Sequence, residues 1–195
     1  MTERAGGRFL VVCTANQCRS PLGAAILGAA IEALDLGITI DSAGVNARPG
    51  SPATAPTVEA AATLGLDLRD HRSQAVTEEL IRGSDLIVTM ERRQVQEVVL
   101  ADLAAFARTF TFKELVRRGT DVGARDPGEP FAGWLARVHS GRRPTDLLGA
   151  SPDDEVVDPT GNALADHRST AAELEALSAA LLELIWPLDE RAAAP

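Results

Sequence analysis

Residues 8–21 read RFLVVCTANQCRSP, and this stretch determines how the rest of the chain is interpreted. Its first part, Arg8 to Cys13, is a short apolar run rich in β-branched residues, typical of a buried parallel strand. A loop of small and polar residues follows. Ser20-Pro21 then predicts the start of a helix, because proline is favoured in the first helical turn. The stretch therefore predicts a strand, a tight loop and a helix.

The same alternation continues along the chain. Gly37 ends the first helix, and the pattern then predicts strands at 38–40, 85–90 and 108–112, helices at 57–64 and 92–107, and a long amphipathic helix at 163–185. Strands that alternate with helices indicate an α/β layer fold with a mainly parallel sheet.

Length and charge narrow the class of protein. A chain of 195 residues, 45% of them hydrophobic, is expected to form a single domain over 1–195. The net charge of −9 argues against nucleic acid or anionic lipid as a partner. No apolar run approaches the roughly 20 residues of a membrane span, and residues 1–7 lack the apolar core of a signal peptide. We therefore expect a cytoplasmic protein.

One region interrupts the pattern. Between Lys113 and Asp154 many glycines and prolines surround a helix-like piece at 131–139, so we expect an otherwise irregular segment. Residues 117–154 are interpreted as an insertion, either a lid over the substrate or a surface insertion of the kind that long loops allow. The candidate lid residues are Trp134, Arg137, Arg142 and Arg143.

The loop after the first strand has the residue types of an oxyanion site. Backbone N–H groups at a strand-to-helix turn, with the helix dipole behind them, form a cup for a tetrahedral anion. Arg19 at the helix start can clamp two phosphate oxygens. Cys13 lies at the base of the cup, where positive surroundings favour the nucleophilic thiolate. Ser20 can donate a hydrogen bond to that thiolate when it is the leaving group.

This loop, with Asn16 inside it, resembles the phosphate-binding loop of the low-molecular-weight protein tyrosine phosphatases. The resemblance covers about 8–118 and about 156–188. Its further motifs are 41–44, 65–68, 70–73, 85–90 and Asp158-Pro159. It implies a four-stranded parallel sheet flanked by helices and no cofactor. Only the insertion falls outside it.

The resemblance also implies roles for individual residues. Cys13 becomes the nucleophile that forms a phosphocysteine, Arg19 the phosphate clamp and Asp158 the general acid, with Asp126 in the insertion as a rival acid. Asn16, Ser42 and His71 become the residues that support the loop. The phosphate-binding residues are Thr14, Ala15, Asn16, Gln17, Cys18, Arg19 and Ser20.

Other polar residues receive no such role. His139 and His167 are expected to be ordinary surface residues, and no grouping of His, Cys, Asp and Glu has the spacing of metal ligands. Cys13 and Cys18 lie in one loop, which predicts a disulfide between them under mild peroxide.

Departures from the family pattern leave the substrate open between a phosphotyrosyl protein and a small phosphorylated metabolite. Ala47 and Thr160 stand where aromatic rings would clamp a phenyl group, and the chain has no tyrosine. Gln17 replaces the threonine of phosphoarginine-specific members. No cysteine follows Cys18, which argues against an arsenate reductase. The alternative from another class is a regulatory module that binds an anion without turnover.

Overall fold

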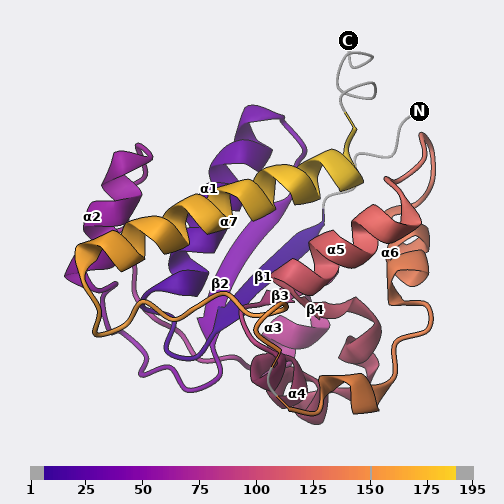
Figure 1. Cartoon of the computed structure of the whole chain (residues 1–195), viewed down its shortest axis with the longest axis horizontal. Coiled ribbons are helices and arrows are strands. Elements are labelled where there is room, and N and C mark those ends of the chain that lie inside the picture. The colour runs from indigo at the N-terminus through magenta and orange to yellow at the C-terminus, as the bar shows by residue number, and fades with distance from the viewer. Residues whose placement is uncertain (1–6, 150, 188–195) are drawn as a thin grey trace.

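The computed structural model describes residues 7–149 and 151–187. At its centre lies a four-stranded parallel sheet in the order β2-β1-β3-β4 (Figure 1). The strands are β1 (Arg8–Cys13), β2 (Thr39–Gly44), β3 (Leu86–Thr89) and β4 (Thr109–Thr111). The predicted fold class and the first strand are confirmed.

Successive side chains of β1 enter two separate cores. Phe9 and Val11 lie in one apolar cluster, whereas Leu10 and Val12 lie in another, and all four are almost fully buried. Strand side chains alternate between the two faces of a sheet. Both faces are covered, which is why this strand reads as an uninterrupted apolar run.

Helices cover both faces of the sheet. The first cluster is completed by α1 (Arg19–Ala33), α2 (Ala55–Thr63), α5 (Phe112–Val122), α6 (Phe131–His139) and α7 (Leu164–Ile185). The second is completed by α3 (Glu78–Arg82), α4 (Arg92–Ala101) and the 3₁₀ segment η1 (Leu103–Arg108). In the described ranges no helix combines the length and the apolar content that crossing a membrane requires.

The segment at 113–154 is more ordered than the sequence predicts. Residues 113–122 belong to α5, whose first turn is capped by Thr111, and a second 3₁₀ segment, η2, covers Pro144–Leu147. Gly119 lies inside α5, where a Cβ atom would stand 2.9 Å from Leu184 and 3.1 Å from Trp134. This glycine therefore permits close packing of α5 against α6 and α7, and reading it as a loop signal was wrong.

Two smaller expectations also need correction. The helix predicted at 92–107 ends at Ala101, because the Asp102 carboxylate accepts a hydrogen bond from the Ala104 N–H and starts η1. The short helix α3, capped by Thr77, was not predicted.

The topology places the first loop at a natural binding position. In the sheet, β2 lies next to β1 on one side, and the following strand, β3, lies next to β1 on the opposite side. In open α/β sheets ligands bind outside the carboxyl ends of the strands where the strand order reverses in this way. Cys13 is the last residue of β1, so the loop at 14–18 lies at this position.

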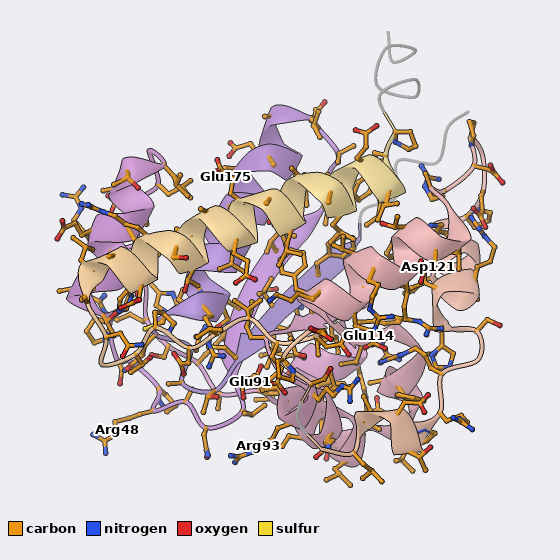
Figure 2. All side chains as sticks on the ribbon, in the orientation of Figure 1. Arg48, Glu91, Arg93, Glu114, Asp121 and Glu175 are labelled. Carbon is orange, nitrogen blue, oxygen red and sulfur yellow. The ribbon has the colours of Figure 1, made fainter. Side chains whose placement is uncertain are left out.

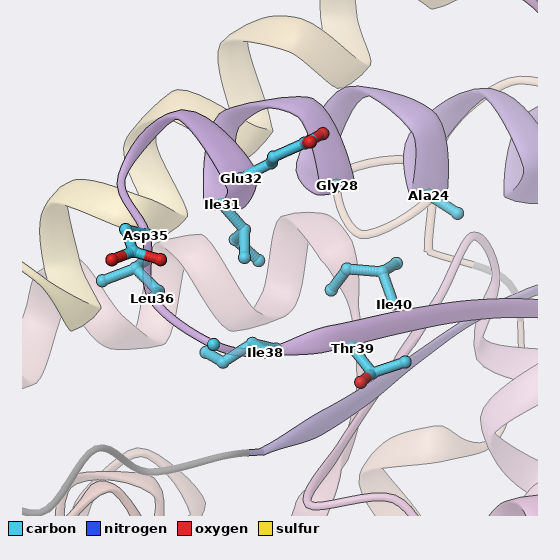
Figure 3. A pocket seen from close by; sticks show the side chains of 10 residues that line it. Ala24, Gly28, Ile31, Glu32, Asp35, Leu36, Ile38, Thr39 and Ile40 are labelled. Atoms are coloured by element: carbon cyan, nitrogen blue, oxygen red, sulfur yellow. The ribbon is translucent and has the colours of Figure 1, made fainter.

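A separate groove of about 500 Å³ lies between α1 and the start of β2. Ile31 and Ile40 face each other across it, and Glu32 and Asp35 stand at its rim (Figure 3). Since Cys13 pairs with Gly44 at the other end of β2, this groove is separate from the loop at 14–18.

The end of the insertion is fixed to the body by Asp154. Its buried carboxylate accepts hydrogen bonds from Arg92 at 2.7 Å and from Arg117 at 2.9 Å. Burial alone would raise the pKa of Asp154, but the hydrogen bonds from Arg117 and Arg92 hold that pKa below its ordinary value. The following backbone is thereby guided to Val156, whose N–H donates to the Met90 carbonyl at 2.9 Å.

Asp154→Asn should lower the free energy of unfolding at pH 7 by about 1–3 kcal/mol, because the amide leaves two arginines without their carboxylate. The folded-state pKa is depressed, so this stabilisation is present above the unfolded pKa and is lost as the pH falls through the folded one. Urea unfolding of both proteins should show the difference shrinking below about pH 4. A difference that stays constant down to pH 2.5 would contradict this account.

Candidate active site

Asn16 holds the loop in an unusual conformation. Its φ is 55°, in the left-handed region that non-glycine residues adopt at a cost. Its side-chain Nδ2 donates to Ser20 Oγ and to Ser42 Oγ, both at 2.9 Å. Its Oδ1 accepts from the Gln74 N–H at 2.9 Å. These three hydrogen bonds join α1, β2 and the segment at Gln74 to this strained residue of the loop.

Two further side chains hold the loop backbone and its threonine. His71 Nε2 lies 2.7 Å from the Asn16 carbonyl oxygen, which can only accept, so Nε2 carries the proton. Gln94 Nε2 donates to Thr14 Oγ1 at 3.2 Å, while Gln94 Oε1 caps the start of α4. The structure thus brings the predicted Asn16, Ser42 and His71 together. Gln94 was missed, although Glu91-x-x-Gln94 is a recognisable capping pattern.

Gly44 allows the loop to lie against the end of β2. A Cβ atom there would stand 2.7 Å from the Thr14 carbonyl oxygen and 2.8 Å from the Asn16 nitrogen. Both are backbone atoms that cannot move aside without displacing the loop. Gly44 was recognised in the sequence as part of a motif, and its contact with the loop explains its place there.

Cys13 lies at the base of the loop and is 3% exposed. Its Sγ accepts a hydrogen bond from the Asn16 N–H at 3.3 Å and lies 3.0 Å from Ser20 Oγ. The Ser20 hydroxyl also lies 3.2 Å from the Ala43 carbonyl oxygen. Because the hydroxyl has one proton, it can turn from Ala43 to Cys13 when the sulfur is negatively charged. The positive end of α1, which begins at Arg19, belongs to the same loop and favours negative charge bound there.

Arg19 is almost fully buried, and protein acceptors satisfy its guanidinium only in part. Its Nη1 bonds to Glu91 and, at 3.0 Å, to the Val156 carbonyl, and its Nη2 bonds to Asp158 Oδ2 at 2.7 Å. Its Nε is buried and has no partner among the described residues. Glu91 stands at the start of α4 (Figure 2).

The backbone just before Arg19 also has N–H groups without a protein acceptor. Over the described ranges, the N–H groups of Ala15, Gln17 and Cys18 donate to no other protein group. Arg19 Nε is the buried one of these donors, and a buried donor without an acceptor costs about 1–3 kcal/mol. Arg19 Nε and these N–H groups belong to one loop, so the arrangement suits an oxyanion that supplies the acceptors.

A small cavity brings these groups together. It is lined by Cys13, Ala15, Gln17, Cys18, Arg19, Asp158 and Thr160. The strand, the first helix and the loop before α7 each contribute to it, although Asp158 follows Arg19 by 139 residues. Arg48, from the loop after β2, points away from the body (Figure 2). No aromatic side chain lines this cavity.

Asp126 does not lie at this cavity. Its neighbour Arg125 bonds through its N–H to the Leu184 carbonyl near the end of α7. Since α7 has 22 residues, it spans about 33 Å, and its other end follows the Asp158 loop. The structure therefore places Asp158, and not Asp126, beside Cys13.

The structure places the four candidate lid residues away from this cavity. Trp134 is fully buried and its Nε1 donates to the Gly123 carbonyl, while Arg137 is paired with Glu129. Arg142 is buried in an ion pair with Glu114, and its guanidinium lies 4.0 Å from the centre of the Phe110 ring. Arg143 pairs with Asp146 at the surface. None of the four lines the cavity. Trp134 and Arg142 attach the segment to the body, whereas Arg137 bonds to residues of the segment itself.

The two remaining histidines are not ordinary surface residues. His167 is 2% exposed, and its Nδ1 lies 3.0 Å from Thr57 Oγ1. His139 is half-buried beside Phe106, and burial, followed by the charges of Arg142 and Arg118, lowers the pKa of His139. Within the part of the chain that the structure describes, no cluster of His, Cys, Asp and Glu could hold a metal ion.

Comparisons with known proteins agree with this geometry. A family model described as low molecular weight phosphotyrosine protein phosphatase matches residues 8–134. The probable low molecular weight protein-tyrosine-phosphatase EpsP of Ralstonia solanacearum is 33% identical over 133 residues, which are 68% of this chain and 89% of that protein. A protein-arginine-phosphatase of Geobacillus stearothermophilus is 35% identical over 142 residues, 72% of this chain and 90% of that protein. A similar solved structure is that of the YwlE arginine phosphatase mutant with a phosphorylated active-site serine. The TM-score is 0.68 at 28% identity, and the match covers 90% of this chain and 93% of that one.

Gly44→Ala should weaken the binding of inorganic phosphate by about tenfold or more, because the added methyl group displaces the loop donors. Isothermal titration calorimetry measures the change. Gly28→Ala is the matched control, since a Cβ there meets nothing within 4 Å. The control should raise stability by about 0.5–1 kcal/mol and leave phosphate binding unchanged. Equal phosphate affinity in the Gly44 variant and the parent would contradict the steric role.

Proposed function

The chain belongs to the low molecular weight phosphotyrosine protein phosphatase family, and from that membership we propose that it hydrolyses phosphomonoesters through a phosphocysteine on Cys13. One observation carries the proposal: the Cys13 sulfur, the unpaired Arg19 Nε and the Asp158 carboxylate meet around one small cavity. The phosphorylated active-site serine of the arginine phosphatase mutant supports a covalent route.

In the first step the Cys13 thiolate attacks phosphorus. A sulfur–phosphorus bond forms as the bond from phosphorus to the ester oxygen breaks, and Asp158 gives its proton to that oxygen. Arg19 and the loop N–H groups of Ala15, Gln17 and Cys18 hold the phosphoryl oxygens. Phosphate displaces Asp158 from Arg19 Nη2, which frees Oδ2 to face the leaving oxygen.

In the second step water attacks the phosphocysteine. Asp158, now a carboxylate, takes a proton from the water as the sulfur–phosphorus bond breaks. The electrons of that bond return to Cys13, and the Ser20 hydroxyl, 3.0 Å away, turns to stabilise the thiolate. The route needs no metal ion, because Arg19 and the backbone dipoles supply the positive charge.

The rival function is an anion-binding module without turnover. Such a module needs Arg19 and the loop donors but gains nothing from a buried thiol at the base or from an acid at the rim. Both lie here within one small cavity. The enzyme is therefore the better account of this set of residues.

Cys13→Ser should reduce turnover of 4-nitrophenyl phosphate to background, because the hydroxyl is a poor nucleophile and a poor leaving group in this site. The same variant should retain phosphate binding in calorimetry, since the donors remain. Arg19→Ala should lose both turnover and binding. Substantial turnover by Cys13→Ser would reject the covalent route, and an unreactive parent that still binds phosphate would favour the anion-binding module.

For the substrate, we propose a small polar phosphomonoester in preference to a phosphotyrosyl protein. The cavity offers Gln17 and Thr160 as polar contacts, and no ring is present at its wall to stack on a phenyl group. The net charge of −9 disfavours nucleic acid as the phosphate carrier. By their names, the relatives described above act on tyrosine or arginine phosphates.

Phosphotyrosine peptides should therefore have a kcat/KM no higher than that of sugar or nucleoside monophosphates. Initial rates on a matched panel, measured with the parent protein, test this directly. Arg143→Ala should leave the ranking unchanged, because Arg143 lies outside the cavity. A clear preference for phosphotyrosine peptides would contradict the proposal and indicate a phosphotyrosyl protein as the substrate.

A further inference from the structure

Thr160 connects the Asp158 carboxylate to Cys18. Its Oγ1 lies 2.8 Å from Asp158 Oδ1 and 3.4 Å from Cys18 Sγ, and it can donate to either atom. Its N–H also donates to Oδ1 at 3.1 Å. Oδ1 is thus held by Thr160, whereas Oδ2 faces Arg19 and the cavity.

From Cys18 the contacts continue into the interior. Cys18 Sγ lies 3.3 Å from Thr54 Oγ1, which lies 2.8 Å from Thr57 Oγ1. Thr57 Oγ1 lies 3.0 Å from His167 Nδ1. Thr57 and His167 are 1% and 2% exposed. An unbroken row of polar atoms therefore runs from the acid at the rim to a buried imidazole on α7.

The protons of this row are coupled, because each group has a single proton to give. When His167 Nδ1 accepts from Thr57, Thr57 accepts from Thr54 and Thr54 accepts from the Cys18 S–H. The Cys18 sulfur is then left as an acceptor for Thr160. Thr160 can donate to Cys18 while Asp158 holds its proton, and to Asp158 once that proton has been given away.

We propose that His167, Thr57 and Thr54 are positioning residues that act through Cys18 and Thr160 on the Asp158 carboxyl. They keep the Cys18 S–H turned inward, so that Thr160 has an alternative acceptor during the step in which Asp158 acts as an acid. This inference rests on the proposed role of Asp158. It adds to that role a set of residues that touch neither the substrate nor the reacting atoms.

A comparison of two substrates tests it. Phenyl phosphate has a poor leaving group and needs the acid, whereas 4-nitrophenyl phosphate needs it much less. Thr57→Val removes the hydroxyl and keeps the shape. It should lower kcat/KM for phenyl phosphate by about three- to tenfold, the range of one hydrogen bond, and that for 4-nitrophenyl phosphate by less than about twofold. Thr57→Ser should restore the parent ratio between the two substrates.

Thr170→Val is the matched control: Thr170, on α7, is buried like Thr57 on α2, and among the described residues its hydroxyl bonds only to the Asp166 carbonyl. It should leave the ratio unchanged. Thr160→Val and Thr160→Ser repeat the test at an exposed position, where folding is not at risk. The valine variant should lower the ratio and the serine variant should preserve it. An equal loss on both substrates in Thr57→Val and Thr160→Val, or no loss, would overturn the proposal.

A double variant that combines Asp158→Asn with Thr57→Val distinguishes a failure of this inference from a failure of the proposed function. Asp158→Asn alone should lower kcat/KM for phenyl phosphate much more than for 4-nitrophenyl phosphate, and adding Thr57→Val should then change the ratio no further. A further change in the Asp158→Asn background would show that Thr57 acts by another route, which rejects the proposal. If Asp158→Asn itself leaves the ratio unchanged, the acid assignment fails and the positioning role fails with it.

Discussion

The left-handed backbone at Asn16 is the constraint on which the rest of the site depends. A loop that turns this tightly directs its N–H groups inward, but the conformation costs about 1–3 kcal/mol in a residue with a side chain. The Asn16 amide offsets this cost with hydrogen bonds to Ser20, Ser42 and Gln74. Because these partners come from three elements, the sheet and helices must assemble before the loop can hold its shape.

The loop at 14–18 could be predicted because the sequence signals that define it are close together along the chain. The strand, the turn and the helix start follow one another within 14 residues, and each has its own signal in residue type. Asp158 is far away in sequence, and only its resemblance to the family's Asp-Pro loop before the last helix indicated it; in the structure it lines the cavity. The four-stranded sheet followed from the same alternation of strands and helices.

The sequence was least informative for residues whose partners are distant in sequence and carry no motif. Nothing near Arg142 in the sequence indicates its ion pair with Glu114, 28 residues earlier. Trp134 fits against Gly119, and that glycine was itself taken as a sign of an irregular loop. His167 was assigned to the surface because Thr57, its partner, lies 110 residues away. In each case the missing information was a tertiary contact between elements that the sequence pattern treats separately.

Arg19 and Arg142 show what distinguishes a binding arginine from a structural one. Both are buried and both pair with carboxylates. The five N–H donors of Arg142 have Glu114, the carbonyls of Phe106 and Thr109, and His139 Nδ1 as acceptors, so none remains for a ligand. Arg19 keeps its Nε unpaired beside unpaired N–H groups of the loop. The residue type and its burial are therefore not informative by themselves, whereas the unsatisfied donor shows that the site is built for an acceptor from outside the chain.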